Sequence, residues 1–394
     1  MKSTNKLLFF SLLSIFLLNN SQATITYNVV DLGANPDGIT DSTPAFLSAW
    51  NSACGSSEQA IIYVPQGSFL LQETHFNGPC KCGYIFMKIE GTIVAPPDYN
   101  VLRNTKHWIY FQAVDGLIVQ GGVLDGRGSG LWQCKRSGNS CPGGATTLTF
   151  HKSKNIKITG LTSRDSQLFH IDIHGCENAN LHNVTVLAPE KSPNTDGIHV
   201  QLSTGVTILE AEIHTGDDCI SIGQGTSNLW IENVNCGPGH GISIGSLAKK
   251  FEEEGVQNIT VKSVSMTNTQ NGMRIKTWGR PCNSFVKEVL FHDVTMENVK
   301  NPIIIDQNYC PRHKGCPGQA SGVKISDIHY QGIHGTSASK TAIKIECSET
   351  NPCTDITLED ISLNYKNRPA KAWCSNASGK QSGAVDPGTC FDPQ

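Results

Sequence analysis

A short phrase recurs along the chain, and its spacing constrains the fold more than any other sequence feature. In each copy apolar and polar residues alternate, and Asn, Asp, Gly or Ser stands before the last apolar residue. Successive copies lie 23 to 34 positions apart and are centred on Ile158, Leu181, Ile208, Ile231, Val261, Phe291, Ile325 and Leu358. Alternation with a period of two and many β-branched residues predicts β-strands rather than helices.

Short strands at this period favour an all-β, single-domain parallel β-helix. One coil cannot bury its own inward face, so a continuous core forms only when many coils stack. The 38 glycines and the aromatic share of 7% agree with tight corners and thin coils. Asn at the corners is expected to take the left-handed conformation and to bond along the stack. A β-sandwich is the rival fold, but its strands would recur every ~8–12 residues.

Both ends of a solenoid must be covered. A short N-terminal capping helix is expected after Asp41, with Ser42 or Thr43 as its cap and Pro44 in its first turn. Ala45, Phe46, Ala49 and Trp50 would form its apolar face. The segment after Lys366 is rich in Gly, Ser and Pro, and we expect a loop there.

The first 23 residues have the composition of a secretory signal peptide. Lys2 and Lys6 precede an apolar run from Leu7 to Leu18, and Ser21-Gln22-Ala23 has the small-x-small pattern of a cleavage site. No later stretch reaches ~18 continuous apolar residues, so no membrane partner is expected. We expect residues 24–394 to form a single catalytic domain. The formal net charge of −3 without a basic cluster also excludes a nucleic-acid partner.

Fifteen cysteines after a secretion signal indicate an oxidising, extracellular compartment. Local spacing predicts the disulfides Cys219–Cys236, Cys310–Cys316, Cys347–Cys353 and Cys374–Cys390, and the odd count leaves at least one thiol without an intramolecular partner. A zinc site is disfavoured because no paired Cys-x-x-Cys spacing occurs. Glycosylation sequons begin at Asn183, Asn258 and Asn376.

Acidic residues occupy matching positions of successive repeats. Asp196, Asp218, His240 and Asn271 are separated by 22, 22 and 31 residues, and each is followed by Gly or Cys and alternating apolar residues. Neighbouring strands in a stack lie roughly 4.8 Å apart, so these side chains should form one column with Asp217 beside it. Repulsion among three close carboxylates should raise the pKa of at least one.

One protonated and one ionised carboxyl group are what glycoside hydrolysis needs. Arg274 and Lys276 share strand parity and point to the same face. They either neutralise the acidic column or bind carboxylates of a polyuronic acid. A calcium site is a further reading of clustered carboxylates, although His240 and the two cations disfavour it.

Four motifs in order give the chain a resemblance to plant polygalacturonases: Asn194-Thr195-Asp196, Gly216-Asp217-Asp218, Gly239-His240-Gly241 and Arg274-Ile275-Lys276. Asp31-Leu32-Gly33-Ala34, Gly78-Pro79-Cys80-Lys81 and Gly122-Val123-Leu124-Asp125-Gly126 extend it over nearly all of residues 24–394. The resemblance implies a right-handed parallel β-helix that hydrolyses α-1,4-galacturonan with inversion, as a secreted monomer in the cell wall. The alternatives are a calcium-dependent pectate lyase and a non-catalytic pectin-binding protein.

The resemblance also implies residue roles. Asp217 would be the general acid, Asp196 and Asp218 would hold and activate water, and His240 would maintain the proton balance of the acid. Asn194 would orient its neighbours, and Arg274, Lys276 and Tyr309 would contact the sugar. No catalytic metal or cofactor is expected. The segment Trp278-Gly279-Arg280-Pro281-Cys282 departs from the family pattern and leaves the cleft wall beside it open.

Overall fold

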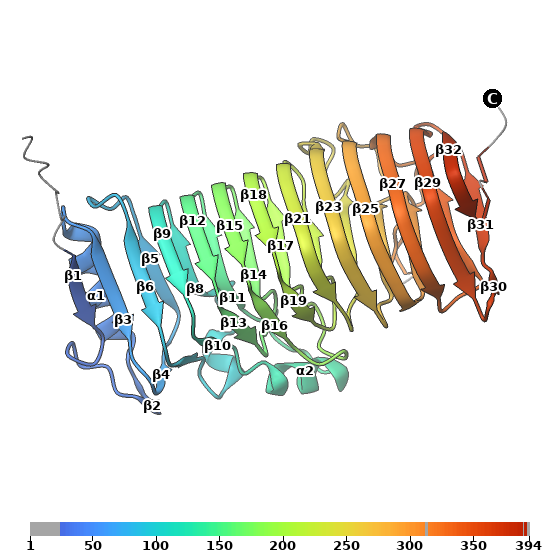
Figure 1. Cartoon of the computed structure of the whole chain (residues 1–394). Coiled ribbons are helices and arrows are strands. Elements are labelled where there is room, and N and C mark those ends of the chain that lie inside the picture. The colour runs from blue at the N-terminus through green and yellow to red at the C-terminus, as the bar shows by residue number, and fades with distance from the viewer. Residues whose placement is uncertain (1–23, 312–313, 389, 392–394) are drawn as a thin grey trace, which may run out of the picture.

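The computed structural model describes residues 24–311, 314–388 and 390–391, and its strands wind into a solenoid of stacked coils (Figure 1). The sequence prediction of a parallel β-helix is therefore confirmed. The signal peptide predicted for residues 1–23 lies outside the described residues. Within the described residues no helix is long and apolar enough to cross a membrane.

The strands form three parallel ladders that run along the solenoid. The first ladder contains β1 (Ile25–Asn28), β3 (Ala60–Val64), β6 (Ile85–Ile89), β9 (Asp115–Gln120), β12 (Lys154–Thr159), β15 (Glu177–His182), β18 (Thr204–Leu209), β21 (Ser227–Cys236), β23 (Val256–Thr267), β25 (Phe285–Val299), β27 (Lys324–Ser337), β29 (Cys353–Tyr365) and β32 (Ala377–Asp386). The second ladder contains β2 (Asp37–Asp41), β4 (Ser68–Leu70), β7 (Thr92–Val94), β10 (Val123–Asp125), β13 (Thr162–Arg164), β16 (Thr185–Leu187) and β19 (Glu212–His214), and it joins the first at β21.

The third ladder carries the candidate site. It contains β5 (Thr74–Asn77), β8 (His107–Gln112), β11 (Thr146–His151), β14 (Ile171–His174), β17 (Ile198–Gln201), β20 (Ile220–Ile222), β22 (Ile242–Leu247), β24 (Asn271–Thr277), β26 (Asn301–Asp306), β28 (Thr341–Glu346) and β31 (Lys371–Ser375). The remaining elements are α1 (Thr43–Gly55), η1 (Tyr99–Leu102), α2 (Ser129–Arg136) and β30 (Arg368–Pro369), which pairs antiparallel with β29. Trp132 of α2 donates its indole N–H to the Ser166 carbonyl at 3.1 Å, which holds α2 against the turn after β13.

The core consists of columns of inward side chains, as the repeated phrase predicts. Ile158, Leu181, Ile208, Ile231, Val261 and Phe291 are register partners on successive coils, and each is fully buried. Aromatic rings stack in the same way, with 4.8 Å between the Phe76 and Phe111 centroids and 5.1 Å between Phe111 and Phe150. This regular stacking holds each outward residue at a fixed height along the solenoid.

The predicted frame of one repeat is wrong. The register partner of Phe291 is Tyr330, whereas Ile325 pairs with Val286. Both Ile325 and Tyr330 are buried in the 14-residue strand β27, whose alternation fits the phrase in two frames. Only the pairing with β25, which the phrase itself does not contain, selects between them.

The Asn residues at the corners behave as predicted. Asn155, Asn178, Asn228 and Asn258 have φ values between 52° and 57°, in the left-handed region. Asn258 donates its amide N–H to the Asn228 side-chain oxygen at 2.6 Å, and Asn178 donates to Asn155 at 3.4 Å. The amide side chains thus link neighbouring coils at a corner that most residues disfavour.

The N-terminal cap is the helix α1 (Thr43–Gly55), as predicted, and Phe46 and Trp50 are buried against the first coils. Neither predicted capping side chain caps it. The Ser42 hydroxyl instead accepts from the Asn35 N–H at 3.1 Å, and that of Thr43 accepts from the Gln72 N–H at 2.8 Å. The Asp41 carboxylate accepts from the Thr43 N–H at 2.9 Å.

The prediction of a loop after Lys366 is also wrong. This segment forms β30, β31 and β32, and the last two pair in parallel with β28 and β29 to make a further coil. Its composition favours a loop, but the preceding coil offers a free edge of backbone groups that an additional strand can satisfy.

All four predicted disulfides are present, and the structure adds Cys54–Cys80 and Cys134–Cys141. The bridge from Cys54 ties the end of α1 to a turn of the solenoid. Cys82, Cys176 and Cys282 are unpaired and buried. Local spacing identified four bridges but missed Cys134–Cys141, although its cysteines are only 7 residues apart, and Cys54–Cys80 depends on where α1 packs.

Candidate active site

Four residues of the predicted column lie on adjacent coils of the third ladder. Ile198, Ile220, Ile242 and Met273 are successive register partners, and each follows its column residue by two positions. Asp196, Asp218, His240 and Asn271 are therefore aligned across the stack. The column prediction is confirmed.

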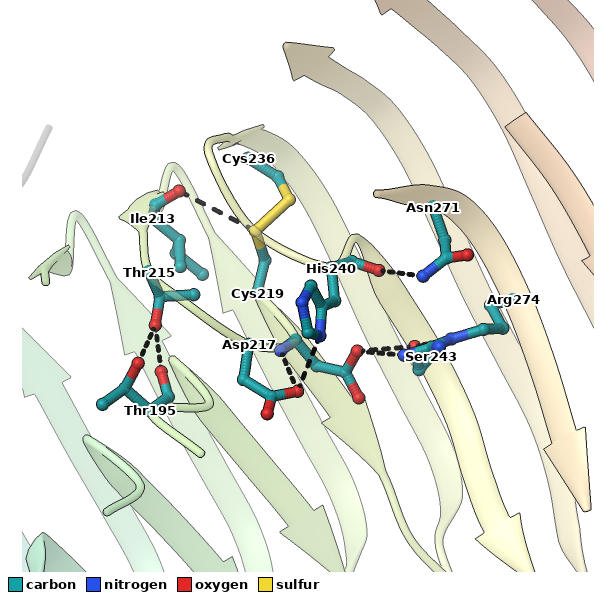
Figure 2. Close-up of a disulfide and its surroundings, with 11 residues drawn as sticks. Thr195, Ile213, Thr215, Asp217, Cys219, Cys236, His240, Ser243, Asn271 and Arg274 are labelled. Carbon is teal, nitrogen blue, oxygen red and sulfur yellow. Dashed lines mark hydrogen bonds and ion pairs between the residues drawn. A yellow bond between two sulfur atoms is a disulfide. The ribbon is translucent and has the colours of Figure 1, made fainter. Parts of the chain in front are cut away.

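Asp218 lies at the centre of the site and is held by two cations. Its carboxylate oxygens accept from Arg274 at 2.5 Å and from the Lys276 ammonium at 2.7 Å. Ser243 donates its hydroxyl to Asp218 at 2.9 Å and accepts from Arg274 Nε at 2.8 Å (Figure 2). All four side chains are buried, and the structure brings both predicted cations into contact with the acidic column.

These contacts separate the pKa values of the two buried carboxyl groups. Burial alone would raise the pKa of Asp218, but Lys276 and Arg274 outweigh it and lower this pKa to about 2. The pKa of Asp196 is raised well above its ordinary value, first by burial and then by repulsion from Asp217 and Asp218. The sequence prediction that one carboxyl group of the cluster has a raised pKa agrees with this result.

Asp217 and His240 form the accessible part of the site. The His240 ring nitrogen Nδ1 lies 3.0 Å from the Asp217 carboxylate, and the side chains are 34% and 20% exposed. The Asp218 N–H donates to the same Asp217 oxygen at 2.9 Å. Asn194, exposed on the preceding coil with φ of 59°, donates to the other oxygen at 3.5 Å. A ligand at the surface can therefore reach Asp217 and His240 directly.

Three buried hydroxyl groups next to the acidic residues form a cluster that the sequence did not predict. The Thr195 hydroxyl is 2.7 Å from that of Ser192 and 2.8 Å from that of Thr215, and all three side chains are buried. Thr215 also donates to the Thr195 carbonyl (Figure 2). The hydroxyl cluster fixes the turns that carry Asp196 and Asp217. Its signal in the sequence was a Thr beside each acidic motif, because Thr195 precedes Asp196 and Thr215 precedes Gly216-Asp217.

Tyr309 lies on the C-terminal side of the cations. The Lys276 ammonium is 5.4 Å from the centroid of its ring, and the Tyr309 N–H donates to the Thr277 carbonyl at 3.0 Å. Trp278, from the segment that departs from the family pattern, contacts Tyr309 edge-on at 5.4 Å. A hollow of about 800 Å³ opens here, lined by residues that include His240, Asn271 and Tyr309.

The donor atoms of Asp217, Asp218 and His240 lie within 4.8 Å of one another, which suits a small metal ion in distance alone. Both oxygens of Asp218 already accept from cationic groups, and a nearby ammonium and guanidinium repel a metal cation. Calcium also prefers an all-oxygen ligand set. These residues do not fit a resident metal.

A family model described as "Glycosyl hydrolases family 28" matches residues 54–384, and a shorter model, "Rhamnogalacturonase A/epimerase, pectate lyase-like", matches residues 26–78. The chain belongs to glycosyl hydrolase family 28. Its resemblance to this family, inferred from four short motifs, is confirmed over most of the chain.

Two relatives each cover at least 91% of this chain. A polygalacturonase of Prunus persica is 56% identical over 99% of this chain and 100% of its own length. An exopolygalacturonase of Platanus acerifolia is 42% identical over 91% of this chain and 97% of its own. Among solved structures, the endo-xylogalacturonan hydrolase from Aspergillus tubingensis superposes with a TM-score of 0.79 at 24% identity, over 92% of this chain and 100% of that one. At that identity the superposition supports the fold alone.

Proposed function

We propose that this family 28 glycoside hydrolase hydrolyses α-1,4-galacturonosyl linkages of pectin or polygalacturonate. The observation that carries the proposal is the aligned column of Asp196, Asp218 and His240 with the partly exposed Asp217 beside it. The names of the relatives add the substrate class. Neither the lyase alternative nor the non-catalytic one has a comparable observation in its favour.

In the proposed reaction Asp217 is the general acid. It gives its proton to the glycosidic oxygen as the bond to the anomeric carbon breaks, and His240 at 3.0 Å is placed to restore that proton. Water held by Asp196 and Asp218 attacks the anomeric carbon from the opposite face and gives up a proton to Asp196. The products are one chain with a new reducing end and one chain with a free hydroxyl group at the former linkage.

Repulsion from Asp217 is one cause of the raised pKa of Asp196, so a proton on Asp217 weakens this cause. In the proposed productive form the proton is on Asp217 and Asp196 is ionised. Asp218, with its pKa of about 2, stays ionised and balances Arg274 and Lys276.

We assign substrate contact to Asn194, Arg274, Lys276 and Tyr309. Arg274 and Lys276 each have donors beyond the one that contacts Asp218, and those donors can bind a galacturonate carboxylate. Tyr309 offers a half-buried ring and hydroxyl beside Lys276. No cofactor is part of the proposal.

The direct test is Asp217→Asn, which removes the transferable proton and changes the shape of the side chain very little. Release of reducing ends from polygalacturonate should fall at least about 100-fold, because general acid catalysis contributes ~10²–10⁴. Asp355→Asn, an exposed position at φ 55° on the first ladder, is the control and should keep full activity. Activity of Asp217→Asn near that of the control contradicts the proposal. Products that absorb in the ultraviolet and vanish with a chelator would instead establish the lyase.

Inversion is tested separately. Proton NMR during the first minutes of hydrolysis should show the anomer opposite to the α-linkage, before the free sugar equilibrates by mutarotation. Initial release of the α-anomer would require a covalent intermediate on one of the aspartates. The roles given to Asp196 and Asp218 would then be wrong.

We further propose that residues 1–23 direct secretion and that residues 24–394 act outside the cell, in the wall, as a monomeric catalytic domain. Six disulfides support an oxidising compartment. N-terminal sequencing of the secreted protein should begin near residue 24. Digestion with a glycosidase that removes N-linked glycans tests Asn183, Asn258 and Asn376, and light scattering tests the monomer.

A further inference from the structure

His240 stands between two glycines, Gly239 and Gly241, so its own chain does little to hold its backbone. Glycine lacks the Cβ that restricts φ and ψ, and Gly241 has a φ of 85°, which few other residues adopt at low cost. The His240 ring nevertheless lies 3.0 Å from the Asp217 carboxylate, where the proposed proton return needs it. Groups on neighbouring coils must therefore fix the peptide units on either side of His240.

Two hydrogen bonds hold those peptide units. The His240 N–H donates to the Asp217 carbonyl on the preceding coil at 2.7 Å. From the following coil, Asn271 donates its side-chain N–H to the His240 carbonyl at 3.2 Å (Figure 2). The first bond needs no particular side chain, whereas the second exists only while residue 271 carries a donor. Asn271 is 2% exposed, so water does not readily replace that donor.

Asn271 is held in turn by the next coil. Asn301, its register partner, donates its side-chain N–H to Asn271 Oδ1 at 3.0 Å and to the Gln270 carbonyl at 3.1 Å. Because the Gln270 carbonyl can only accept, it determines which end of the Asn301 amide carries the nitrogen. The oxygen of Asn271 then faces Asn301, and its nitrogen faces His240. Side chains of two successive coils thus donate in one direction, toward His240.

The backbone of Asn271 also packs directly against the turn of His240. A Cβ on Gly241 would lie 2.1 Å from the Asn271 carbonyl oxygen and 2.4 Å from that of Gly272, so a side chain does not fit there. The two coils therefore touch at this point. The contact between Asn271 and His240 belongs to tightly packed backbone and is not a chance approach of two surface groups.

We propose that Asn271 is a positioning residue for the reaction, whose amide, oriented by Asn301, fixes the His240 backbone so that the imidazole stays on Asp217. The inference rests on the proposed function, since it concerns the same general acid. After each cleavage Asp217 has lost its proton. His240 gives it a proton from Nδ1, and the ring then takes up another from water.

This role predicts an effect on turnover rather than on binding of the polymer. His240 acts on the proton of Asp217, so a displaced imidazole lowers kcat and leaves the contacts that bind the sugar in place. A direct contact between Asn271 and the sugar is the competing reading, because Asn271 also lines the hollow of about 800 Å³. Loss of such a contact would raise KM instead.

The test is Asn271→Leu, which nearly keeps the shape of the side chain and removes its donor. On polygalacturonate, kcat should fall roughly tenfold while KM stays within about twofold, as expected for the loss of one hydrogen bond to a buried carbonyl. In a His240→Ala background the same substitution should cost less than about twofold, because no imidazole remains to be positioned. His240→Ala alone should lower kcat by more than Asn271→Leu does.

Two further variants keep the test decisive. Asn301→Ala removes the amide that orients Asn271 at a partly exposed position, so it serves where Asn271→Leu does not fold. It should lower kcat by roughly threefold, and this loss should also vanish in the His240→Ala background. Asn298→Gly is the matched control. Asn298 donates to Asn268 at 2.8 Å between the same two coils, at an exposed corner with φ of 53° that Gly also adopts, and its loss should leave kcat and KM unchanged.

Equal losses of kcat from Asn271→Leu with and without the imidazole overturn the inference, because the effect then does not pass through His240. An unchanged kcat in Asn271→Leu overturns it as well, and a raised KM in that variant identifies Asn271 as a sugar contact. A wild type that releases no reducing ends is a different result, since it removes the proposed function itself and the inference with it.

Discussion

Asp218 is the residue on which the electrostatics of the site depend. Its two oxygens contact Arg274 and Lys276, and all three side chains are withdrawn from water. Sequence placed these cations beside the acidic column and left two readings open, neutralisation and substrate binding. The observed ion pairs establish neutralisation. Substrate binding by the remaining donors of Arg274 and Lys276 stays a proposal.

Removal of Lys276 tests how much this arrangement stabilises the fold. Lys276→Met leaves one oxygen of a buried carboxylate without its cation, so the pKa of Asp218 should rise from about 2 and stability should fall by up to ~3–5 kcal/mol at pH 6. Denaturant unfolding measures the loss. Lys344→Met is the matched control, because Lys344 contacts Glu346 at the same 2.7 Å but on the surface, with side chains 40% and 26% exposed.

The control should lose less than ~1 kcal/mol, since exposed ion pairs contribute little. The difference between the variants should also shrink as the pH approaches 3, where the carboxyl group of the Lys276→Met variant takes up a proton. Equal losses in the two variants would show that the buried pair has no special weight.

At the scale of elements, the disulfide Cys219–Cys236 connects the turn of the site to the end of β21. Cys219 directly follows Asp218, and its partner Cys236 ends β21 at the same corner of the next coil (Figure 2). The chain offers a close match in Cys374–Cys390, which closes a separation of 16 residues against 17 but lies in the last coil.

Replacing both cysteines of either bridge by Ala should therefore cost a similar ~3 kcal/mol of stability, because the loops constrained in the unfolded chain are nearly equal in length. Only the Cys219→Ala/Cys236→Ala variant should also lose hydrolytic rate, since it loosens the turn that carries Asp217 and Asp218. Thermal unfolding and reducing-end assays separate the two effects. A parallel loss of rate in the Cys374→Ala/Cys390→Ala variant would mean that the bridge near the site does not position it.

Elements were predictable where the information is local. The strands centred on Ile158 to Phe291 follow from alternation alone, and the column of Asp196, Asp218 and His240 follows because the same alternation recurs beside it. The frame of β27, the side chain that caps α1 and the final coil depend on partners distant in sequence. Asp172 was not singled out, because a lone Asp in a strand gains meaning only when its neighbours on other coils are known.

At the scale of the whole molecule, the three buried carboxyl groups act on stability in opposite directions. The pKa of Asp218 is lowered, so its contribution is present above the unfolded pKa of ~3.9 and is lost as the pH falls toward 2. The pKa values of Asp172 and Asp196 are raised, so both favour the folded state when protonated. Their contributions decline as the pH rises from about 4, and that of Asp172 is lost as the pH passes about 7.

The melting temperature should therefore peak in mildly acidic solution and fall on both sides. Asp172→Asn removes one group from the alkaline side, so it should raise the melting temperature at pH 8 relative to the wild type and change it little at pH 4. Calorimetry across this range gives the profile. A melting temperature of Asp172→Asn that runs parallel to the wild type at every pH would show that Asp172 does not keep its proton on folding.

The three unpaired thiols are spread along the solenoid, Cys82 near one end, Cys176 at the middle and Cys282 toward the other end. Burial raises the pKa of Cys176 and of Cys282 to about 11, so a thiol reagent cannot modify them while their coils stay closed. The rate at which each cysteine is alkylated therefore measures how often the coils around it open. Pulse alkylation read peptide by peptide would reveal whether the stack frays inward from its termini or first parts at the centre.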